Sequence, residues 1–245
     1  MPELVTGRIG EAEPRGEPGL EPWGIAGLDG SAKGLVARAF NMVAMPDHEA
    51  AYAVAAHFLG EGLRDGGRAA LVSLDNPCLT LAELERYGFD FESALQLERL
   101  VYLYYKPVFL HSLSLSTDYA AIFAEIRRLT GDIRRLALLN ADLIFNLQSE
   151  HLAAASVSNL VAATGRLNFT VLGCFVPQQT DAHQSLHASC SNLMPLYVTG
   201  TRLAHAGRRY RLEARKSVGT QQGTVVLNLD AGHGHIRVTS YAEIA

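Results

Sequence analysis

Two histidines and a cysteine stand at a spacing that suits a metal ion. His183, His187 and Cys190 follow one another at steps of four and three residues, so a helix would place them close to one face. Imidazole nitrogens and thiolates are ligands that Zn²⁺ prefers. The segment offers no obvious fourth ligand, however, and polar residues surround it, which favours exposed helix histidines. We therefore predict no metal site here.

Nucleophilic residues give weaker signals. Cys174 lies in an apolar stretch, where a thiol packs as a small hydrophobic group. The three cysteines, Cys78, Cys174 and Cys190, are an odd and sparse set, which indicates reduced thiols in a cytoplasmic protein. Serine, histidine and aspartate all occur, but no G-x-S-x-G segment presents a serine on a strand-to-helix turn. The sequence therefore predicts no nucleophilic catalysis.

The segment between the first expected strand and the helix after it would hold phosphate in a P-loop enzyme. Such a loop reads G-x-x-x-x-G-K-[ST], so that backbone amides, the lysine and the hydroxyl grip phosphate and Mg²⁺. Residues 45–52 contain no glycine, lysine, serine or threonine, and they include the acids Asp47 and Glu49. Two carboxylates would repel a triphosphate, which argues against nucleotide hydrolysis.

Cationic side chains gather near the C-terminus. Arg209, Arg211 and Arg215 alternate with apolar residues, so a strand would place them on one face. The basic residues of this predicted hairpin are Arg202, Arg208, Arg209, Arg211, Arg215 and Lys216. The face is either solvated or a contact surface for an acidic protein partner, a neighbouring subunit or anionic lipid. Nucleic acid is least favoured, because the net charge is −4 and no aromatic residues interleave the arginines.

Composition indicates an ordinary globular chain. Of 245 residues, 48% are apolar and 19% are charged. No apolar run approaches the roughly 18 residues that a membrane helix needs, and no signal-peptide core is evident. Residues 1–22 are rich in glutamate, proline and glycine, which predicts a flexible acidic tail. Residues 23–245 are expected to form one domain.

Strands and helices alternate along most of that domain, which predicts an α/β layered fold. Strands are expected at residues 35–44, 69–74, 100–105, 135–139 and 169–176, and the main helices at 50–63, 80–87, 119–129 and 151–164. Asp47 is expected to cap the helix at 50–63. Ile122, Ile126 and Leu129 are expected to form the apolar face of the helix at 119–129.

The last fifty residues or so change character. Short strands are expected at residues 196–204, 210–216, 224–229 and 235–241, with turns at 205–207 and 230–232. Strands of this length separated by turn residues predict an antiparallel meander. It would close one edge of a mostly parallel central sheet.

The order of these segments resembles the RecA-like ATPase core of the KaiC family. Asp75 and Asn76 end a strand where that family has two acids, and residues 87–91 resemble its Gly-aromatic-Asp motif. Residues 210–219 look like its terminal K-x-R-G strand. The resemblance covers residues 24–220. It implies a RecA-like three-layer α/β fold with a mostly parallel central sheet and an antiparallel C-terminal β-meander.

The same resemblance identifies what the chain lacks. Ala51 and Tyr52 stand near the positions of the phosphate-binding lysine and the Mg²⁺-binding Ser/Thr. Asn140 replaces the Walker B aspartate, and Val218 replaces the arginine of K-x-R-G, whereas Lys216 is kept. Phosphoryl transfer depends on positioned charge and metal, so catalysis is not expected. The residues of this degenerate nucleotide site are Asp47, Glu49, Ala51, Tyr52, Asp75 and Asn140.

A narrower resemblance is to the N-terminal NTPase-like domain of the BcsE family, which regulates bacterial cellulose secretion. Residues 47–50, 69–75 and 167–173 carry it. It implies a docking module at a synthase complex on the inner membrane. The R-x-G-D signature with which the C-terminal half of that family binds cyclic di-GMP has no counterpart here, so dinucleotide binding is not implied.

The chain is thus expected to be a non-catalytic pseudo-ATPase without a cofactor. It would act as a regulatory or scaffolding protein-interaction module in the biosynthesis and secretion of bacterial cellulose or another exopolysaccharide. Expected partners are components of a membrane-bound polysaccharide synthase complex and further copies of the chain. It would lie in the cytoplasm, reaching the inner membrane through partners. The alternative is a nucleotide-binding KaiC/RecA-like ATPase switch, for signalling or recombination, with an unorthodox loop.

Overall fold

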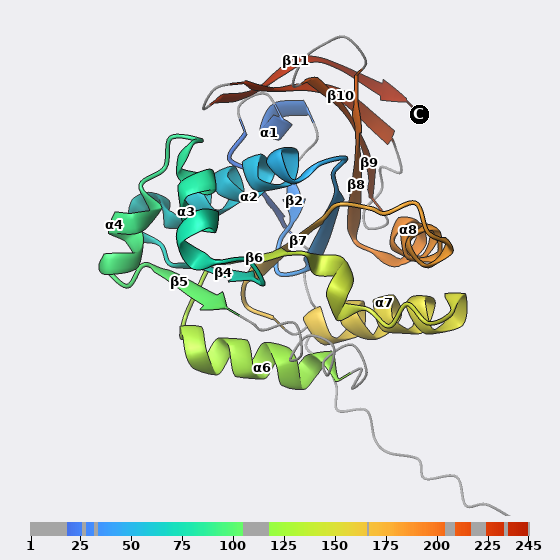
Figure 1. The fold of residues 1–245 in the computed structure, drawn as a ribbon, viewed down its shortest axis with the longest axis horizontal. Coiled ribbons are helices and arrows are strands. Elements are labelled where there is room, and N and C mark those ends of the chain that lie inside the picture. The colour runs from blue at the N-terminus through green and yellow to red at the C-terminus, as the bar shows by residue number, and fades with distance from the viewer. Residues whose placement is uncertain are drawn as a thin grey trace, which may run out of the picture.

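The computed structural model describes residues 19–25, 28–31, 34–104, 118–165, 167–203, 209–216, 224–232 and 235–244. Helices cover both faces of a central sheet, which confirms the predicted α/β fold class (Figure 1). The strands are β1 (Leu20–Glu21), β2 (Leu35–Val36), β3 (Phe40–Ala44), β4 (Ala69–Ser73), β5 (Leu100–Tyr104), β6 (Arg135–Leu139), β7 (Thr170–Phe175), β8 (Leu196–Arg202), β9 (Arg209–Lys216), β10 (Thr224–Gly232) and β11 (His235–Ile244). The helices are α1 (Leu28–Ser31), α2 (His48–Leu63), α3 (Pro77–Glu85), α4 (Phe91–Gln96), α6 (Tyr119–Thr130), α7 (Glu150–Thr164) and α8 (Asp181–Leu193), with 3₁₀ turns η1 (Arg64–Gly66) and η2 (Ala141–Ile144).

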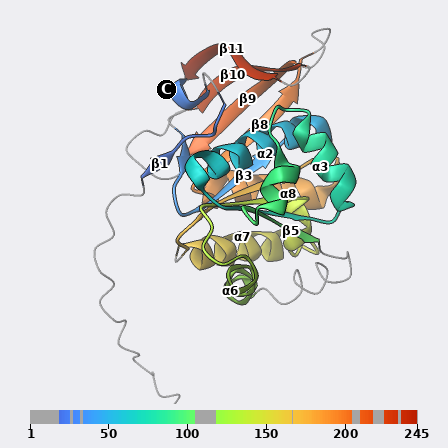
Figure 2. The same ribbon diagram turned by 90° about the vertical axis from the view of Figure 1, so that its left-hand side faces the viewer.

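The central sheet has a parallel part and an antiparallel part. Among the described residues its strand order is β11-β10-β9-β8-β3-β7-β6-β4-β5. Every neighbouring pair from β8 to β5 is parallel, and every pair from β8 to β11 is antiparallel. The predicted C-terminal meander is therefore confirmed. Its last strands, β10 and β11, curve over the side of the sheet that carries α1 and α2 (Figures 1 and 2).

Burial explains why the parallel strands are so apolar. Each residue of β3, β4, β6 and β7 is buried, as expected for a parallel sheet covered on both faces. Helix α2 packs on β4, β6 and β7, while α6 and α7 lie on the opposite side of the sheet (Figure 2). Alanines make up much of the buried surface of α2, so its backbone can approach the strands closely.

The strand expected at residues 35–44 is interrupted. Arg38 adopts a left-handed backbone conformation (φ 54°) between β2 and β3. The Asn41 side chain holds this turn, since its Oδ1 accepts from the Val36 amide at 2.9 Å and its Nδ2 donates to the Val36 carbonyl at 3.0 Å. Strand β2 can therefore pair with β1 instead of extending β3. Residues 20–21 thus belong to a strand, whereas residues 1–18 of the expected tail lie outside the described part of the chain.

The apolar face predicted for α6 is confirmed at Ile126 and wrong at Leu129, because the helix is rotated slightly from the predicted orientation. The buried residues are Tyr119, Phe123, Ile126 and Thr130, whereas Leu129 is 46% exposed. Phe123 makes an edge-to-face contact with Phe40 of β3, at a centroid distance of 6.4 Å. Two aromatic rings bury more apolar surface than the aliphatic side chains, so they turn the helix toward the sheet.

The last hairpin turns later than expected. Strand β10 continues through the predicted turn at residues 230–232, and Gly232 pairs with His235. The predicted turn at residues 205–207 lies outside the described residues.

Candidate functional site at the carboxyl ends of the parallel strands

The carboxyl ends of β3, β4, β6 and β7 meet at one edge of the sheet. Ligands of open α/β sheets bind outside this edge. A hollow there is lined by His48, Ala51, Tyr52, Asp75, Leu139, Asn140, Cys174, Phe175 and Val176. The structure thus brings together Ala51, Tyr52, Asp75 and Asn140 of the predicted degenerate site. Three separate segments supply them, namely helix α2 and the residues that follow β4 and β6.

A tyrosine that lines the hollow is hydrogen-bonded to Asp75. The Tyr52 hydroxyl donates to Asp75 Oδ2 at 2.8 Å, and the Tyr102 hydroxyl donates to the Asp75 carbonyl at 3.0 Å. Burial, aided by the hydrogen bond to Asp75, raises the pKa of Tyr52, so the phenol remains a donor at neutral pH. The remaining space is about 10 Å³, which is room for about one water molecule.

The start of α2 is occupied by a carboxylate of the chain itself. Asp47 caps the helix, as predicted, and its Oδ1 accepts from the Ala50 amide at 2.9 Å. The Tyr210 hydroxyl donates to Asp47 Oδ2 at 3.0 Å, and the Arg202 guanidinium lies 4.0 Å from the same oxygen. A helix N-terminus attracts anions through its free amides and its dipole. Here Asp47 already supplies that negative charge.

Glu49 faces another direction. Its carboxylate lies 4.0 Å from the Arg86 guanidinium, and its carbonyl accepts from the Tyr87 hydroxyl at 3.1 Å. Glu49 does not line the hollow. Asp47 does not line the hollow either, so both acids stand apart from Ala51, Tyr52, Asp75 and Asn140.

Asn140 directly follows β6 and adopts a left-handed conformation (φ 56°, ψ 42°). Asparagine tolerates this region better than most residues with a side chain. Its Oδ1 is buried and has no hydrogen-bond partner among the described residues. The base of the hollow therefore offers one acceptor and no carboxylate at the position where the resemblance expects a Walker B aspartate.

The predicted histidine pair separates in the structure. His183 is buried, with Nε2 3.2 Å from Asp142 Oδ2, so the prediction of exposed histidines is wrong for this residue. His187 is exposed and its Nδ1 lies 2.9 Å from the Tyr197 hydroxyl. Cys190 is buried, and burial raises its thiol pKa to about 12. Within the described ranges no group of three His, Cys, Asp or Glu side chains could hold a metal ion.

The predicted arginine face can be followed in part. Tyr210, Leu212 and Ala214 are buried, which confirms the predicted alternation along β9. Arg211 is exposed and lies 3.5 Å from the Glu213 carboxylate. For Arg209, Arg215 and Lys216 the structure describes only the backbone, and Arg208 lies outside the described residues.

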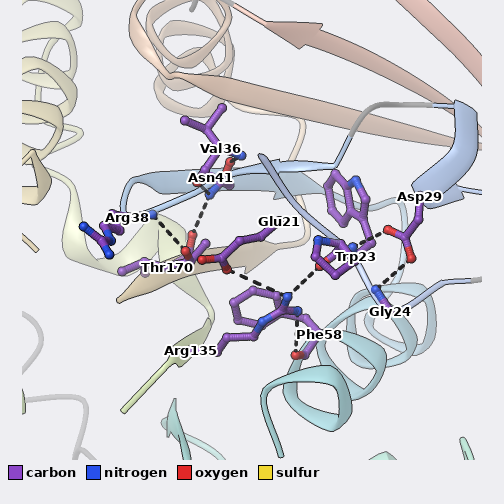
Figure 3. Close-up of polar contacts among 12 residues, drawn as sticks. Glu21, Trp23, Gly24, Asp29, Val36, Arg38, Asn41, Phe58, Arg135 and Thr170 are labelled. Atoms are coloured by element: carbon purple, nitrogen blue, oxygen red, sulfur yellow. Dashed lines mark hydrogen bonds and ion pairs between the residues drawn. The ribbon is translucent and has the colours of Figure 1, made fainter. Parts of the chain in front are cut away.

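Sequence reasoning missed a buried arginine at the opposite, amino end of the sheet (Figure 3). Arg135 donates to the Phe58 carbonyl at 3.1 Å and to the Pro22 carbonyl at 2.7 Å. Its guanidinium lies 4.8 Å from the centre of the Phe58 ring and 3.8 Å from the Glu21 carboxylate. Burial lowers the pKa of Arg135, and Glu21 opposes this. The sequence signal for these contacts is a single arginine in the otherwise apolar strand β6.

Asp29 holds the same N-terminal segment from another side. Its carboxylate accepts from the amides of Trp23 and Gly24 (Figure 3). The Gly24 carbonyl in turn lies 2.9 Å from Nδ1 of His57 in α2. In these contacts side chains of the fold bind the backbone of residues 22–24. We call Arg135, Asp29, His57 and the backbone they bind the amino-end cluster, and we assign it a structural role.

No helix in the described part of the chain is both long and apolar enough to cross a bilayer. No protein-family model matches the chain, and no curated protein matches it either. These comparisons therefore assign no family to the chain.

Proposed function

We propose that this chain is a degenerate RecA/KaiC-like domain that does not turn over nucleotide. It acts as a regulatory or scaffolding module, which binds other proteins in the secretion of bacterial cellulose or a related exopolysaccharide. The mostly parallel three-layer fold supports the first part. The resemblance to the BcsE family supports the assignment to secretion.

The observation that carries the proposal is the filled carboxyl-end edge. Tyr52, bonded to Asp75, occupies the space beside α2, and the Asp47 carboxylate occupies the helix N-terminus. Phosphoryl transfer relies on cations and Mg²⁺ arranged around the phosphates. Ala51 and Asn140 supply neither a cation nor a metal-binding carboxylate at the two relevant positions.

Surface charge supports a role in protein contacts. Arg211 projects from β9 and Arg202 from the end of β8, with exposed fractions of 47% and 59% for their side chains. Arginine pairs with carboxylates through two parallel hydrogen bonds, which suits it to protein interfaces. The proposed partners are acidic surfaces of a membrane-bound synthase complex and further copies of this chain.

Thermal unfolding with ATP, ADP or cyclic di-GMP, each with Mg²⁺, tests the loss of the nucleotide site. A ligand at 100 times its Kd adds about 2.7 kcal/mol of stability, which would raise the Tm of a chain this long by roughly 5–10 °C. We expect no shift with any of the three, and no Mg²⁺-dependent ATP hydrolysis above background.

Asn140→Gly is the matched variant, because glycine accepts the left-handed backbone and removes the side chain at the base of the hollow. A shift of that size in the wild type that disappears in Asn140→Gly would contradict the proposal. It would establish the alternative, a nucleotide-binding switch.

A further inference from the structure

A hydroxyl, an imidazole and a carboxylate form a hydrogen-bonded row at the carboxyl edge, beside the filled hollow. Thr180 Oγ1 lies 3.0 Å from His183 Nδ1, and His183 Nε2 lies 3.2 Å from Asp142 Oδ2. Asp142 belongs to η2, directly after β6, while Thr180 follows β7 and caps α8. Two neighbouring parallel strands therefore bring the three groups together (Figure 1).

The two ends of the row differ in their exposure to solvent. Asp142 and His183 are only 9% and 8% exposed, whereas Thr180 is exposed. The Phe175 ring stacks beside the imidazole at a centroid distance of 6.4 Å and an interplanar angle of 29°. The buried carboxylate and the ring fix the imidazole, and the hydroxyl is the end of the row that solvent and a substrate can reach.

Proton positions follow from the partners. A carboxylate at Nε2 favours the neutral imidazole tautomer with its proton on Nε2, which leaves Nδ1 as an acceptor toward Thr180. The Thr180 oxygen also accepts from the His183 amide at 3.3 Å, so its own proton is free to point to Nδ1. A nucleophile, a base and a third group that orients the base are the signature of an activated hydroxyl.

We propose that Thr180 is an acyl-accepting nucleophile and that the row hydrolyses small carboxylic esters. The Thr180 oxygen attacks the ester carbonyl carbon while its proton passes to His183 Nδ1. The tetrahedral intermediate then expels the alcohol, which takes that proton, and leaves an acyl group on Thr180. Water, deprotonated by the same imidazole nitrogen, attacks this acyl ester, releases the carboxylic acid and restores the hydroxyl.

The surroundings of Thr180 define the substrate class. The first backbone amides of a helix lack partners within the helix, so the first turn of α8 supplies the donors nearest to an oxyanion formed at Thr180. Asp181 follows directly and is exposed, and its carboxylate disfavours anionic acyl groups. Uncharged or cationic esters are therefore favoured over anionic ones. The activity is separate from the nucleotide site and requires no nucleotide.

The probe is 4-nitrophenyl acetate, with release of nitrophenolate and the mass of the Thr180 peptide as two readouts. Wild-type protein is expected to acetylate on Thr180 and then turn over. Thr180→Val should lose labelling and roughly 10² of the rate, which is a typical contribution of positioned acid–base catalysis, and Thr180→Ser should restore both. His187→Ala, one helical turn from His183 and exposed, is the matched control and should leave the rate unchanged.

Folding of each variant is checked by its unfolding transition, because valine also removes the helix cap that serine keeps. Wild-type protein without acetyl on Thr180, or a folded Thr180→Val variant with the wild-type rate, would overturn the proposal. Equal losses in His187→Ala and Thr180→Val would assign the hydrolysis to surface imidazoles and overturn it as well.

Discussion

Two tyrosine–aspartate hydrogen bonds organise the carboxyl edge of the sheet. Tyr52 binds Asp75, and Tyr210 binds Asp47. Each phenol donates to a carboxylate, so negative charge at the carboxyl edge is satisfied from inside the fold. The pKa of both tyrosines is raised, first by burial and then by the neighbouring aspartate. Both phenols therefore remain protonated donors to these carboxylates at neutral pH.

Asp142 gives a residue-scale prediction for stability against pH. Burial raises its pKa, while the hydrogen bond from His183 and the charge of His48 oppose the rise. Between the ordinary pKa of aspartate and the raised folded value, the unfolded chain loses the proton first, so the wild type loses stability as the pH rises. Asp142→Asn lacks this dependence and its amide oxygen can still accept from His183. Urea unfolding measured at several pH values should show this. Between the ordinary aspartate pKa and the raised pKa of folded Asp142, the stability of Asp142→Asn should increase relative to that of the wild type as the pH rises.

Asp90 is the control of opposite sign. Its pKa is lowered by hydrogen bonds from Ser93, so its stabilising contribution is present above the ordinary aspartate pKa and is lost as the pH falls. The disadvantage of Asp90→Asn should therefore shrink toward low pH. The same trend in both variants would show that global charge, and not burial, controls the pH dependence.

Elements were largely predictable from the sequence because parallel strands are buried on both faces. The apolar runs at β4, β6 and β7 located these strands to within about two residues. The break between β2 and β3 was not predictable in this way, because it depends on one side-chain amide, that of Asn41, and on one left-handed residue.

The candidate site was predictable in its location but not in its contacts. Asp75 and Asn140 were placed correctly because the ends of parallel strands share an edge. Within the row, His183 and Asp142 are 41 positions apart in the sequence, and no local motif encodes that pairing. The helical spacing of His183 and His187 drew attention to a metal site, whereas the fold directs the two side chains to different partners.

Strand β9 gives a prediction at the scale of an element. Charge reversal of Arg209 and Arg211 to glutamate should weaken self-association and the capture of acidic partners. Arg211 is exposed on the strand face opposite the buried Tyr210 and Leu212, and the alternation of the sequence predicts the same face for Arg209. The Tm should change little, since an exposed charge contributes about 0–1 kcal/mol to folding. Sedimentation measures self-association, and a pull-down with the proposed synthase components measures the capture of partners.

Arg128→Glu is the matched control for that variant, because Arg128 is exposed on α6, on the other side of the sheet from α1 and α2. It should leave association unchanged. If the Arg209/Arg211 variant retains its oligomeric state and its partners, then this strand face is only solvated.

The N-terminal segment completes the core at the scale of the whole molecule. Trp23, Ile25 and Leu28 are buried, and Arg135 and Asp29 bind the backbone around them. The sequence predicts a tail that ends near residue 22, whereas the contacts of Leu20–Glu21 and Pro22 place the start of the fold slightly earlier. The boundary therefore decides which truncation the protein tolerates.

Two truncations test that boundary. Removal of residues 1–25 deletes Trp23 and Ile25 and leaves the buried Arg135 without its Pro22 and Glu21 contacts. Losing one large core side chain costs about 2–5 kcal/mol, and an unpaired buried cation costs a similar amount. Together these losses rival the roughly 5–15 kcal/mol that stabilises a typical domain, so we expect no cooperative unfolding transition near the wild-type Tm.

Removal of residues 1–18 should leave the Tm within about 2 °C, because acidic, proline-rich segments bury little apolar surface. Circular dichroism melting measures both, and a stable protein lacking residues 1–25 would show that the amino-end cluster is dispensable.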